Sequence, residues 1–254
     1  MRSSDMHCHI LPGIDDGARD FTTSIGMLRT EASEGVDRII CTPHYKPGRH
    51  NASPRRIQEL TEMLQERVDI ENLGITLYIG NEILYSDETP ELLEWGKVLT
   101  LADSDHVLIE FYPHDQFRRI RNAVYELVTA GFVPVIAHAE RYAELLKHPE
   151  YVRELSEMGA MIQLNASSVT GRHGAGVRTF CAKLLKEGRV DFIATDAHDL
   201  KGRAPALAAC RKHVAAHYGE AYADKIFYGN ALSVMEADDL PEDREEEDSS
   251  VDEQ

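Results

Sequence analysis

Short apolar runs alternate with longer amphipathic segments along most of the chain. The apolar runs are rich in β-branched residues and predict strands, at 5–9, 38–44, 76–83, 106–111, 133–138, 161–165 and 191–198. The segments between them repeat apolar residues at helical spacing and predict helices. These helices are expected at 22–35, 53–70, 90–95 and 120–131, before 158, up to 188, and at 204–218 and 219–226. Thr22 or Thr23 should cap the first helix, and Pro54 suits the first turn of the second.

Strand and helix alternate seven times, which predicts an α/β fold with parallel strands covered by helices. Both a (β/α) barrel and a doubly wound open sheet fit this alternation. The sequence contains no internal repeat and no glycine-rich phosphate loop. The choice between the two folds therefore depends on where the polar residues lie.

The formal net charge of −17 is concentrated at the carboxyl end of the chain. Residues 236–254 contain eleven acidic residues and one arginine, so we expect a disordered acidic tail after a folded domain at 1–235. The folded part is moderately acidic and has no basic patch of the kind that nucleic-acid binding requires. The composition therefore argues against a nucleic-acid-binding protein.

The four cysteines, Cys8, Cys41, Cys181 and Cys210, lack the spacing of a zinc knuckle or a disulfide framework. None has an arginine six positions later, which excludes a cysteine-based phosphatase loop. No apolar run is long enough to span a membrane, and no signal peptide is visible. We therefore expect a cytoplasmic protein with no membrane insertion.

Metal-competent side chains recur at or just beyond the carboxyl ends of the predicted strands. They are His7, His9, Asp16, His44, Glu82, Glu110, His138, Asp196 and His198. In a parallel barrel all of these ends open on one face, where the active site lies. Five imidazoles and four carboxylates suit Mn²⁺, Fe²⁺ or Zn²⁺, and nine ligands are more than one ion needs. Two or three ions sharing bridging carboxylates would activate water for attack on a phosphoester.

Each of these residues also has an ordinary structural interpretation. His44 could be a loop histidine beside Pro43, Glu110 could pair with a basic residue, and Asp196 could be a capping residue. The role of His50 is left open. The remaining histidines considered are expected to be ordinary surface residues, namely His106, His114, His148 and His173.

Two arginines follow the candidate ligands closely. Arg141 comes directly after the segment that begins at His138, and Arg203 comes five residues after His198. A guanidinium can bind a phosphoryl group through paired hydrogen bonds. Either side chain could instead lie on a helix surface, so a phosphate-binding role is one of two interpretations.

Seven short motifs together resemble the PHP (polymerase and histidinol phosphatase) superfamily. They are HCHILPGIDDG at 7–17, TPH at 42–44, GNE at 80–82, IEF at 109–111, HAERY at 138–142, QLN at 163–165 and TDAH at 195–198. The first motif and HAERY are similar to one branch in particular. That branch comprises the bacterial PHP-type protein-tyrosine phosphatases of capsule and exopolysaccharide loci.

This resemblance implies a distorted (β/α)7 barrel that holds three divalent metal ions, Mn²⁺ most often, with Fe or Zn possible. It implies hydrolysis of phosphotyrosine, with a bacterial tyrosine autokinase that regulates polysaccharide synthesis as the partner. The nine residues above match the metal ligands, and Arg141 and Arg203 match the phosphate-binding arginines. The resemblance leaves the oligomeric state open.

Two other functions compete with this hypothesis. A PHP phosphatase could act on a small ester such as histidinol phosphate, for which a closed pocket is expected. A non-catalytic metal-binding regulatory module is the alternative from another class. It predicts that ligands have been lost, whereas none of the nine is substituted here.

Overall fold

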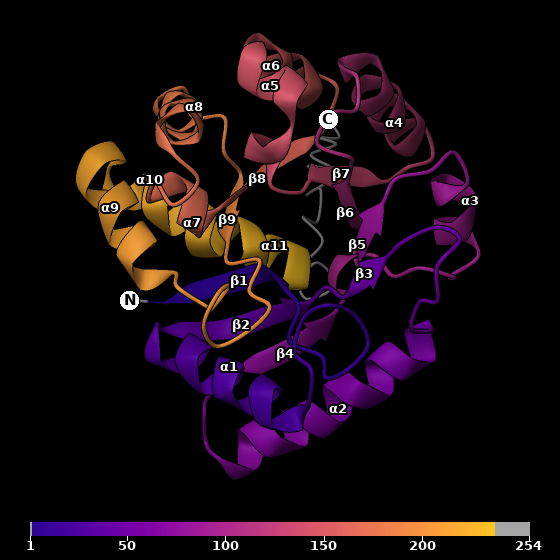
Figure 1. Ribbon diagram of the computed structural model, residues 1–254, viewed down its shortest axis with the longest axis vertical. Coiled ribbons are helices and arrows are strands. Elements are labelled where there is room, and N and C mark those ends of the chain that lie inside the picture. Colours follow the sequence, from indigo (N-terminus) through magenta and orange to yellow (C-terminus); the bar gives the residue numbers. More distant parts are fainter. Residues whose placement is uncertain (1, 237–254) are drawn as a thin grey trace, which may run out of the picture.

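Parallel strands curl around a common axis in the computed structural model, which describes residues 2–236 (Figure 1). The strands are β1 (Ser3–Cys8), β2 (Val36–Cys41), β3 (His44–Tyr45), β4 (Thr76–Ile79), β5 (Glu82–Leu84), β6 (His106–Glu110), β7 (Val133–Ile136), β8 (Met161–Asn165) and β9 (Phe192–Ala194). One sheet has the order β1-β2-β4, and the other has the order β3-β5-β6-β7-β8-β9. Apart from Glu236, the predicted acidic tail lies outside the described residues.

These nine segments act as seven barrel strands, because β2 continues into β3 and β4 continues into β5. The first break falls at Pro43, which has no N–H to donate. At the second break the Asn81 side chain donates to the Pro43 carbonyl over 2.9 Å and accepts from the Leu99 N–H over 2.9 Å. The sequence predicted a single strand at each of these places. The breaks place His44 and Glu82 opposite each other in the β3–β5 pair.

The ring closes where β1 meets the segment after β9. Cys8 and Ala197 form a parallel bridge, and the His9 N–H donates to the Ala197 carbonyl over 2.9 Å. Earlier in β1, the buried Asp5 carboxylate accepts a hydrogen bond from the Thr195 N–H over 3.0 Å and another from the Thr195 hydroxyl. This closure confirms the predicted barrel and excludes the open sheet.

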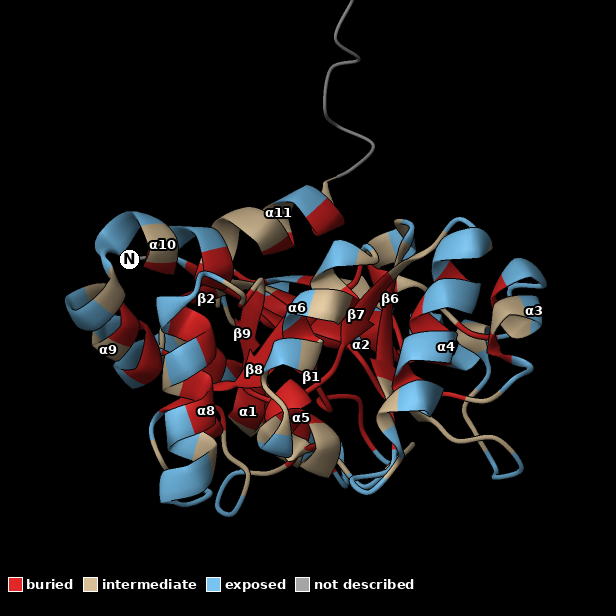
Figure 2. Cartoon of the chain, turned by 90° about the horizontal axis from the view of Figure 1, so that it is seen from above, coloured by how far each residue is buried: buried red, intermediate tan, exposed pale blue. Residues whose placement is uncertain are grey.

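Helices cover the outside of the ring and, at α11, one of its ends (Figure 1). They are α1 (Phe21–Ser33), α2 (Pro54–Ile70), α3 (Thr89–Glu94), α4 (Phe117–Thr129), α5 (Ala143–Lys147), α6 (Glu150–Glu157), α7 (Ala166–Val169), α8 (Ala175–Lys186), α9 (Ala208–Tyr218), α10 (Glu220–Asp224) and α11 (Asn230–Met235). Short 3₁₀ segments lie at η1 (Leu101–Asp103) and η2 (Ala139–Arg141), and a π-helical turn, η3 (Lys225–Gly229), joins α10 to α11. In Figure 2 these helices are buried on their inward faces and exposed outside. No described helix combines the length and apolarity that crossing a membrane would need.

Two details of the helices differ from the sequence predictions. Asp20 caps α1 by accepting the Thr23 N–H over 2.8 Å, so the expected cap at Thr22 or Thr23 was wrong. The helical stretch before 158 is two helices, because Pro149 interrupts it between α5 and α6. Neither difference moves the carboxyl ends of the strands.

One end of the barrel interior is filled by apolar side chains. Met6, Ile40, Leu108, Val135 and Phe192 form a buried cluster with residues of α11. Figure 2 shows α11 lying along that end, with its buried residues toward the strands. The sequence did not predict α11, although Ala231, Val234 and Met235 supply its packed face. A functional site inside the barrel is therefore expected at the opposite end of the interior.

Candidate metal centre

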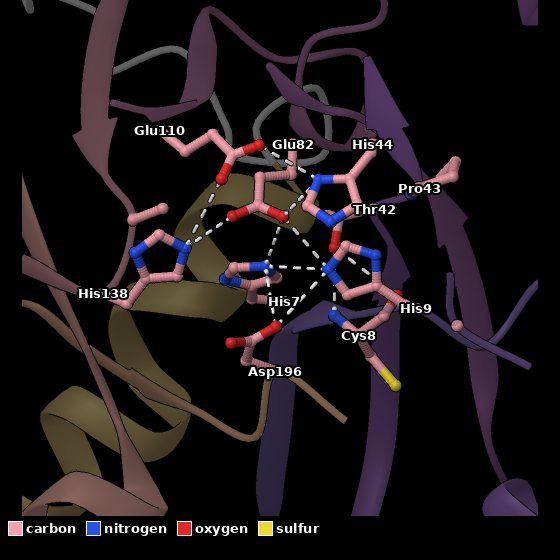
Figure 3. Close-up of polar contacts among 12 residues, drawn as sticks. His7, Cys8, His9, Thr42, Pro43, His44, Glu82, Glu110, His138 and Asp196 are labelled. Atoms are coloured by element: carbon pink, nitrogen blue, oxygen red, sulfur yellow. Dashed lines mark hydrogen bonds and ion pairs between the residues drawn. The ribbon is translucent and has the colours of Figure 1, made fainter. Parts of the chain in front are cut away.

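The nine predicted ligands come together at the carboxyl end of the barrel, with Glu82 at the centre. Figure 3 shows all of them except Asp16 and His198. Glu82 Oε2 lies 3.3 Å from His7 Nε2, 3.1 Å from His9 Nε2 and 2.9 Å from His44 Nδ1. Glu82 Oε1 lies 2.7 Å from His138 Nε2. A single buried carboxylate thus contacts four imidazoles from three other barrel strands.

A second part of the cluster faces the mouth of the barrel. His44 Nε2 lies 3.2 Å from Asp16 Oδ1, and His198 Nε2 lies 3.8 Å from the same oxygen. Asp16 has a side chain that is 61% exposed, whereas Glu82 is almost fully buried. Glu110 Oε1 completes this side at 3.1 Å from His44 Nδ1. The cluster therefore runs from the interior to solvent.

Two of the candidate ligands lie on strained backbone. His138 has φ 33° and Asp196 has φ 52°, both in the left-handed region that non-glycine residues rarely adopt. Each such residue costs about 1–3 kcal/mol, and surrounding contacts must hold it in place. The His138 N–H donates to Gln163 Oε1 over 2.7 Å, and the Asp196 N–H donates to the His7 carbonyl over 2.9 Å. Backbone of this kind is concentrated at functional sites.

The charges within the cluster shift several pKa values strongly. Burial alone would lower the pKa of His9, but the hydrogen bond to Asp15 and the negative charge of the nearby Glu82 raise it to about 9. Burial opposes the same effect at His44, where Asp16 and Glu110 raise the pKa to about 12. The pKa of His198, by contrast, is lowered.

Burial and the nearby His9 lower the pKa of His198 to about 3, so this imidazole is neutral at pH 7. Asp196 has a lowered pKa, because His7 and Arg141 outweigh its burial. Neutral imidazole and ionised carboxylate are the forms that bind metal. His198 and Asp196 are in these forms without further proton loss.

The unsatisfied polar atoms of the cluster fit a site for divalent cations. Among the described residues, His44 Nδ1, Glu82 Oε2, Glu110 Oε1 and His198 Nε2 are buried atoms without a hydrogen-bond partner. His7 Nε2 and His9 Nε2 lie only 3.2 Å apart, and ligand atoms of His7, His9, Glu82 and Asp196 all lie within 4.8 Å of one another. Buried polar atoms of native proteins normally have partners. A cation would satisfy these atoms together, so the donor set fits metal binding.

Three residues that support the cluster were not assigned a role from the sequence. Asp15 Oδ2 lies 2.8 Å from His9 Nδ1 and also accepts the His44 N–H over 3.1 Å. Gln163 Oε1 lies 3.2 Å from His7 Nδ1, and Asn165 donates to Asp196 Oδ2 over 2.8 Å. The adjacent Asp15–Asp16 pair and the Gln-x-Asn spacing on β8 were the available signals. A partner for the second ring nitrogen fixes which nitrogen of a histidine can bind metal.

Arg141 and Arg203 approach Asp196 from two different segments of the chain. Arg203 Nη2 donates to Asp196 Oδ1 over 2.7 Å, and Arg141 Nη2 donates to Oδ2. Their side chains are 35% and 39% exposed, so both line the mouth of the barrel. Neither side chain lies on the surface of an outer helix, since both pair with Asp196, Arg141 from the short 3₁₀ segment η2 and Arg203 from the loop before α9.

Cys8 lies between two candidate ligands but belongs to the outer core. Its side chain packs in the buried cluster between strands and helices, and burial raises the pKa of its thiol well above the usual value. A reactive cysteine needs a stabilised thiolate. The structure therefore agrees with the sequence in excluding a cysteine nucleophile at this position.

Two hollows flank Arg141. The first has a volume of about 350 Å³, and its walls include Glu110, His138 and Arg141 together with Phe111 and Tyr112. The second, of about 490 Å³, lies on the Asp196 side. The first hollow thus joins the metal-ligand cluster to an apolar and aromatic wall.

The histidines expected at the surface stay outside the cluster. His106 lies 2.8 Å from Asp105 at the start of β6, and His148 lies 3.2 Å from Glu150. His50 and His114 are exposed and belong to none of the metal-competent groups among the described residues. His173 lines the second hollow and is considered below.

The sequence matches a family of capsular polysaccharide synthesis and is similar to several tyrosine-protein phosphatases. Residues 3–236 match the family described as "Capsular polysaccharide synthesis, CpsB/CapC". The tyrosine-protein phosphatase YwqE of Bacillus subtilis is 36% identical over 200 residues, which are 78% of each chain. The tyrosine-protein phosphatase CpsB of Streptococcus pneumoniae is 31% identical over 238 residues, covering 91% of this chain and 97% of the relative.

Solved structures extend this similarity to the fold. A structure from work on YwqE and CpsB, described as unique metal-dependent tyrosine phosphatases, superposes with a TM-score of 0.85 at 32% identity. The superposition covers 91% of this chain and 93% of the other. Histidinol phosphate phosphatase from Lactococcus lactis, at 14% identity and a TM-score of 0.59, shares the fold.

Proposed function

This chain belongs to the CpsB/CapC family of capsular polysaccharide synthesis proteins, and on that premise we propose that it is a metal-dependent tyrosine-protein phosphatase. Family membership confirms the resemblance predicted from the motifs. The reaction is hydrolysis of the phosphate ester on a tyrosine side chain. The enzyme is thus a phosphoric monoester hydrolase.

One observation carries this proposal, namely that the metal-competent cluster and an aryl-sized hollow share a wall. Glu110 belongs to both, His138 lines the hollow and lies 2.7 Å from Glu82 of the cluster, and Arg141 also lines the hollow. Phe111 and Tyr112 offer aromatic surface to a ring, while the cluster is positioned to receive the phosphate. A phosphotyrosine side chain combines these two chemical features.

We propose that the cluster holds three divalent cations, with Mn²⁺ as the physiological metal. The ligands are His7, His9, Asp16, His44, Glu82, Glu110, His138, Asp196 and His198. Three of the four groups of close metal-competent side chains lie in this cluster and support this number: His9 with His44 and His198, then His7 with His9, Glu82 and Asp196, then His44 with Glu82 and Glu110. Shared use of His9, His44 and Glu82 suits neighbouring ions with bridging ligands. When bound, such ions activate water and stabilise charge on the phosphoryl oxygens.

The arginines bind and orient the phosphate. Each guanidinium has five N–H donors, and contact with Asp196 uses only some of them. The remaining donors of Arg141 and Arg203 can hold the equatorial oxygens in the geometry of in-line attack. Asp15 keeps His9 oriented by occupying Nδ1, which leaves Nε2 directed into the cluster. No side chain of the chain needs to form a covalent phosphoenzyme.

We further propose a phosphorylated tyrosine autokinase of polysaccharide synthesis as the protein substrate, met in the cytoplasm. The relatives' role in capsular polysaccharide synthesis supports this partner. The four cysteines are buried free thiols, which suits a reducing compartment. The exposed mouth, marked by Asp16, suits a protein substrate better than a closed pocket would.

Metal removal tests this function directly. Protein stripped with EDTA should lose hydrolysis of p-nitrophenyl phosphate and regain it when Mn²⁺ is added. His138→Ala and Asp196→Ala should each abolish turnover, whereas the surface control His148→Ala should behave as wild type. Full activity in metal-free protein would contradict the proposal.

Substrate comparison and metal analysis separate the competing functions. A phosphotyrosine peptide should be hydrolysed far faster than histidinol phosphate, and the reverse order would indicate a small-ester phosphatase. Elemental analysis of protein purified without chelator should show bound transition metal. A metal content near zero, without catalytic turnover, would favour a regulatory module.

A further inference from the structure

The second hollow beside the metal-ligand cluster has the chemistry of an anion site. It lies between the carboxyl ends of β8 and β9 and has a volume of about 490 Å³. Arg141, Arg172 and Arg203 line it, with Asp196 as the carboxylate among its lining residues. Three arginines and one acidic residue therefore line this hollow, on a chain whose formal net charge is −17.

Arg172 distinguishes this hollow from the phosphate-binding arrangement already described. Arg141 and Arg203 are both paired with Asp196. Arg172 makes no ion pair with any residue between 2 and 236, and its side chain lies on the exposed loop between α7 and α8. A guanidinium in this position keeps its full set of donors for a ligand.

Neighbouring donors complete the site. His173 follows Arg172 on the same loop, and its Nε2 lies 3.3 Å from the Ser167 hydroxyl at the edge of the hollow. The loop is held in place because the Arg172 N–H donates to the Ser167 carbonyl over 2.9 Å. Hydroxyl, imidazole and guanidinium groups together suit an oxyanion such as a carboxylate or a phosphate.

The position of Arg141 links this hollow to the substrate. Arg141 lines both hollows, so a group in the second one lies across this side chain from an aromatic ring in the first. A free aryl phosphate fills the cluster and the first hollow alone. A peptide lying across the mouth can bring a neighbouring side chain into the second hollow.

We propose that this hollow, with Arg172 as its principal side chain, binds a second oxyanion carried by the substrate next to the phosphotyrosine. The proposal rests on the function proposed above and narrows its substrate class to acidic or multiply phosphorylated tyrosine segments. A glutamate or aspartate carboxylate and a second phosphotyrosine share the required chemistry.

Three peptides of equal length test this site in the metal-loaded enzyme. Each carries one phosphotyrosine at its centre, flanked by glutamines, by glutamates or by a second phosphotyrosine on one side. For wild type we expect kcat/KM about tenfold higher on the glutamate or doubly phosphorylated peptide than on the glutamine peptide, a value between an exposed ion pair and a buried charge-assisted hydrogen bond. Whichever acidic peptide is preferred identifies the source of the oxyanion.

Arginine variants locate the effect. Arg172→Gln should reduce the tenfold ratio to about twofold, and Arg172→Lys should restore part of it, since the charge is kept but the fork of donors is lost. Arg153→Gln on the outer helix α6 removes the same charge elsewhere and should leave the ratio unchanged. Equal kcat/KM on all three peptides in wild type, or equal ratios in the Arg172→Gln and Arg153→Gln variants, would overturn the site.

Turnover of p-nitrophenyl phosphate separates this proposal from the function on which it rests. If wild type hydrolyses this ester and the glutamine peptide but shows no preference for acidic peptides, the second site is wrong and the phosphatase stands. If the metal-loaded enzyme hydrolyses neither the ester nor any peptide, the proposed function itself fails and the second site falls with it.

Discussion

The two ends of the barrel interior are built from the same strands but have opposite chemistry. On β6, Leu108 packs in the apolar cluster against α11, while Glu110, two residues later on the same face, belongs to the metal-competent group. Likewise, Ala194 at the end of β9 belongs to the apolar cluster, and Asp196, two residues later, belongs to the metal-competent group. The closed end thus supplies hydrophobic burial, and the open end gathers ionisable groups whose burial is costly without partners.

In β1 the change from apolar to metal-competent side chains takes place between two adjacent residues. Met6 lies in the apolar cluster and His7 in the metal-competent group, although adjacent residues of a regular strand face opposite sides. The pairing of β1 with β2 is irregular between Asp5 and Cys8. Such an interruption of regular pairing breaks the alternation of the side chains, so that two successive side chains reach the barrel interior. The division between the two ends therefore lies inside a single strand.

The largest effect is expected from the centre of the open end. Glu82→Gln removes the charge that contacts four imidazoles, so kcat/KM on p-nitrophenyl phosphate should fall by about 10³-fold or more, equivalent to several kcal/mol of transition-state stabilisation. The circular dichroism spectrum should stay that of a folded protein, because the apolar end is untouched. Glu59→Gln on the exposed face of α2 is the matched control. Retention of more than a tenth of the activity in Glu82→Gln would contradict the central role of Glu82 at the open end.

Substitutions at the apolar end should lower the stability of the protein rather than its activity. Phe192 is fully buried in the cluster beneath α11, and Phe192→Ala should lower the free energy of unfolding by about 3–5 kcal/mol. Urea unfolding of the metal-loaded protein measures this loss, and kcat per folded molecule should change little. Phe192→Leu keeps most of the volume and should cost less than about 1.5 kcal/mol. A selective loss of kcat in Phe192→Ala would show that the two ends are not separable.

A smaller effect is expected from the residues that support the open end. Asp15→Asn weakens the contact with His9 Nδ1, so metal affinity should fall by about 10–100-fold, measured by competition with a chelator. Asp20→Asn, five residues further along the chain, keeps a good cap for α1 and should leave affinity unchanged. Equal affinities of the Asp15→Asn and wild-type proteins would show that the orientation of His9 is set elsewhere.

Much of the barrel was predictable because each apolar run carries its own periodicity. The predicted strands over 106–111 and 161–165 match β6 and β8 within one residue. The breaks after Cys41 and Ile79 were not predictable, because they depend on the Asn81 side chain bonding to Pro43 in the neighbouring strand. α11 was missed for a similar reason, since its short apolar face has meaning only against the barrel end.

The gathering of the candidate ligands was predictable from strand ends, since parallel strands deliver their carboxyl ends to one place. The left-handed backbone of His138 and Asp196 was not, because nothing in local sequence distinguishes it. Asp15 and Gln163 act through contacts with residues brought close by closure of the ring. Arg172 lies in a loop whose position relative to Arg141 is set by tertiary structure alone.

The closure between Cys8 and Ala197 has a consequence for how the protein is made. It joins residues 189 positions apart, and the groups contributed by His7 and His9 meet those of Asp196 and His198 only across that seam. A chain still emerging from the ribosome therefore lacks Asp196 and His198, two of the nine candidate ligands, until its last barrel strand is complete. Such long-range contacts form late and slowly. A cation held by residues on both sides of the seam would also stabilise the closed ring, so metal binding and the last step of folding would be coupled.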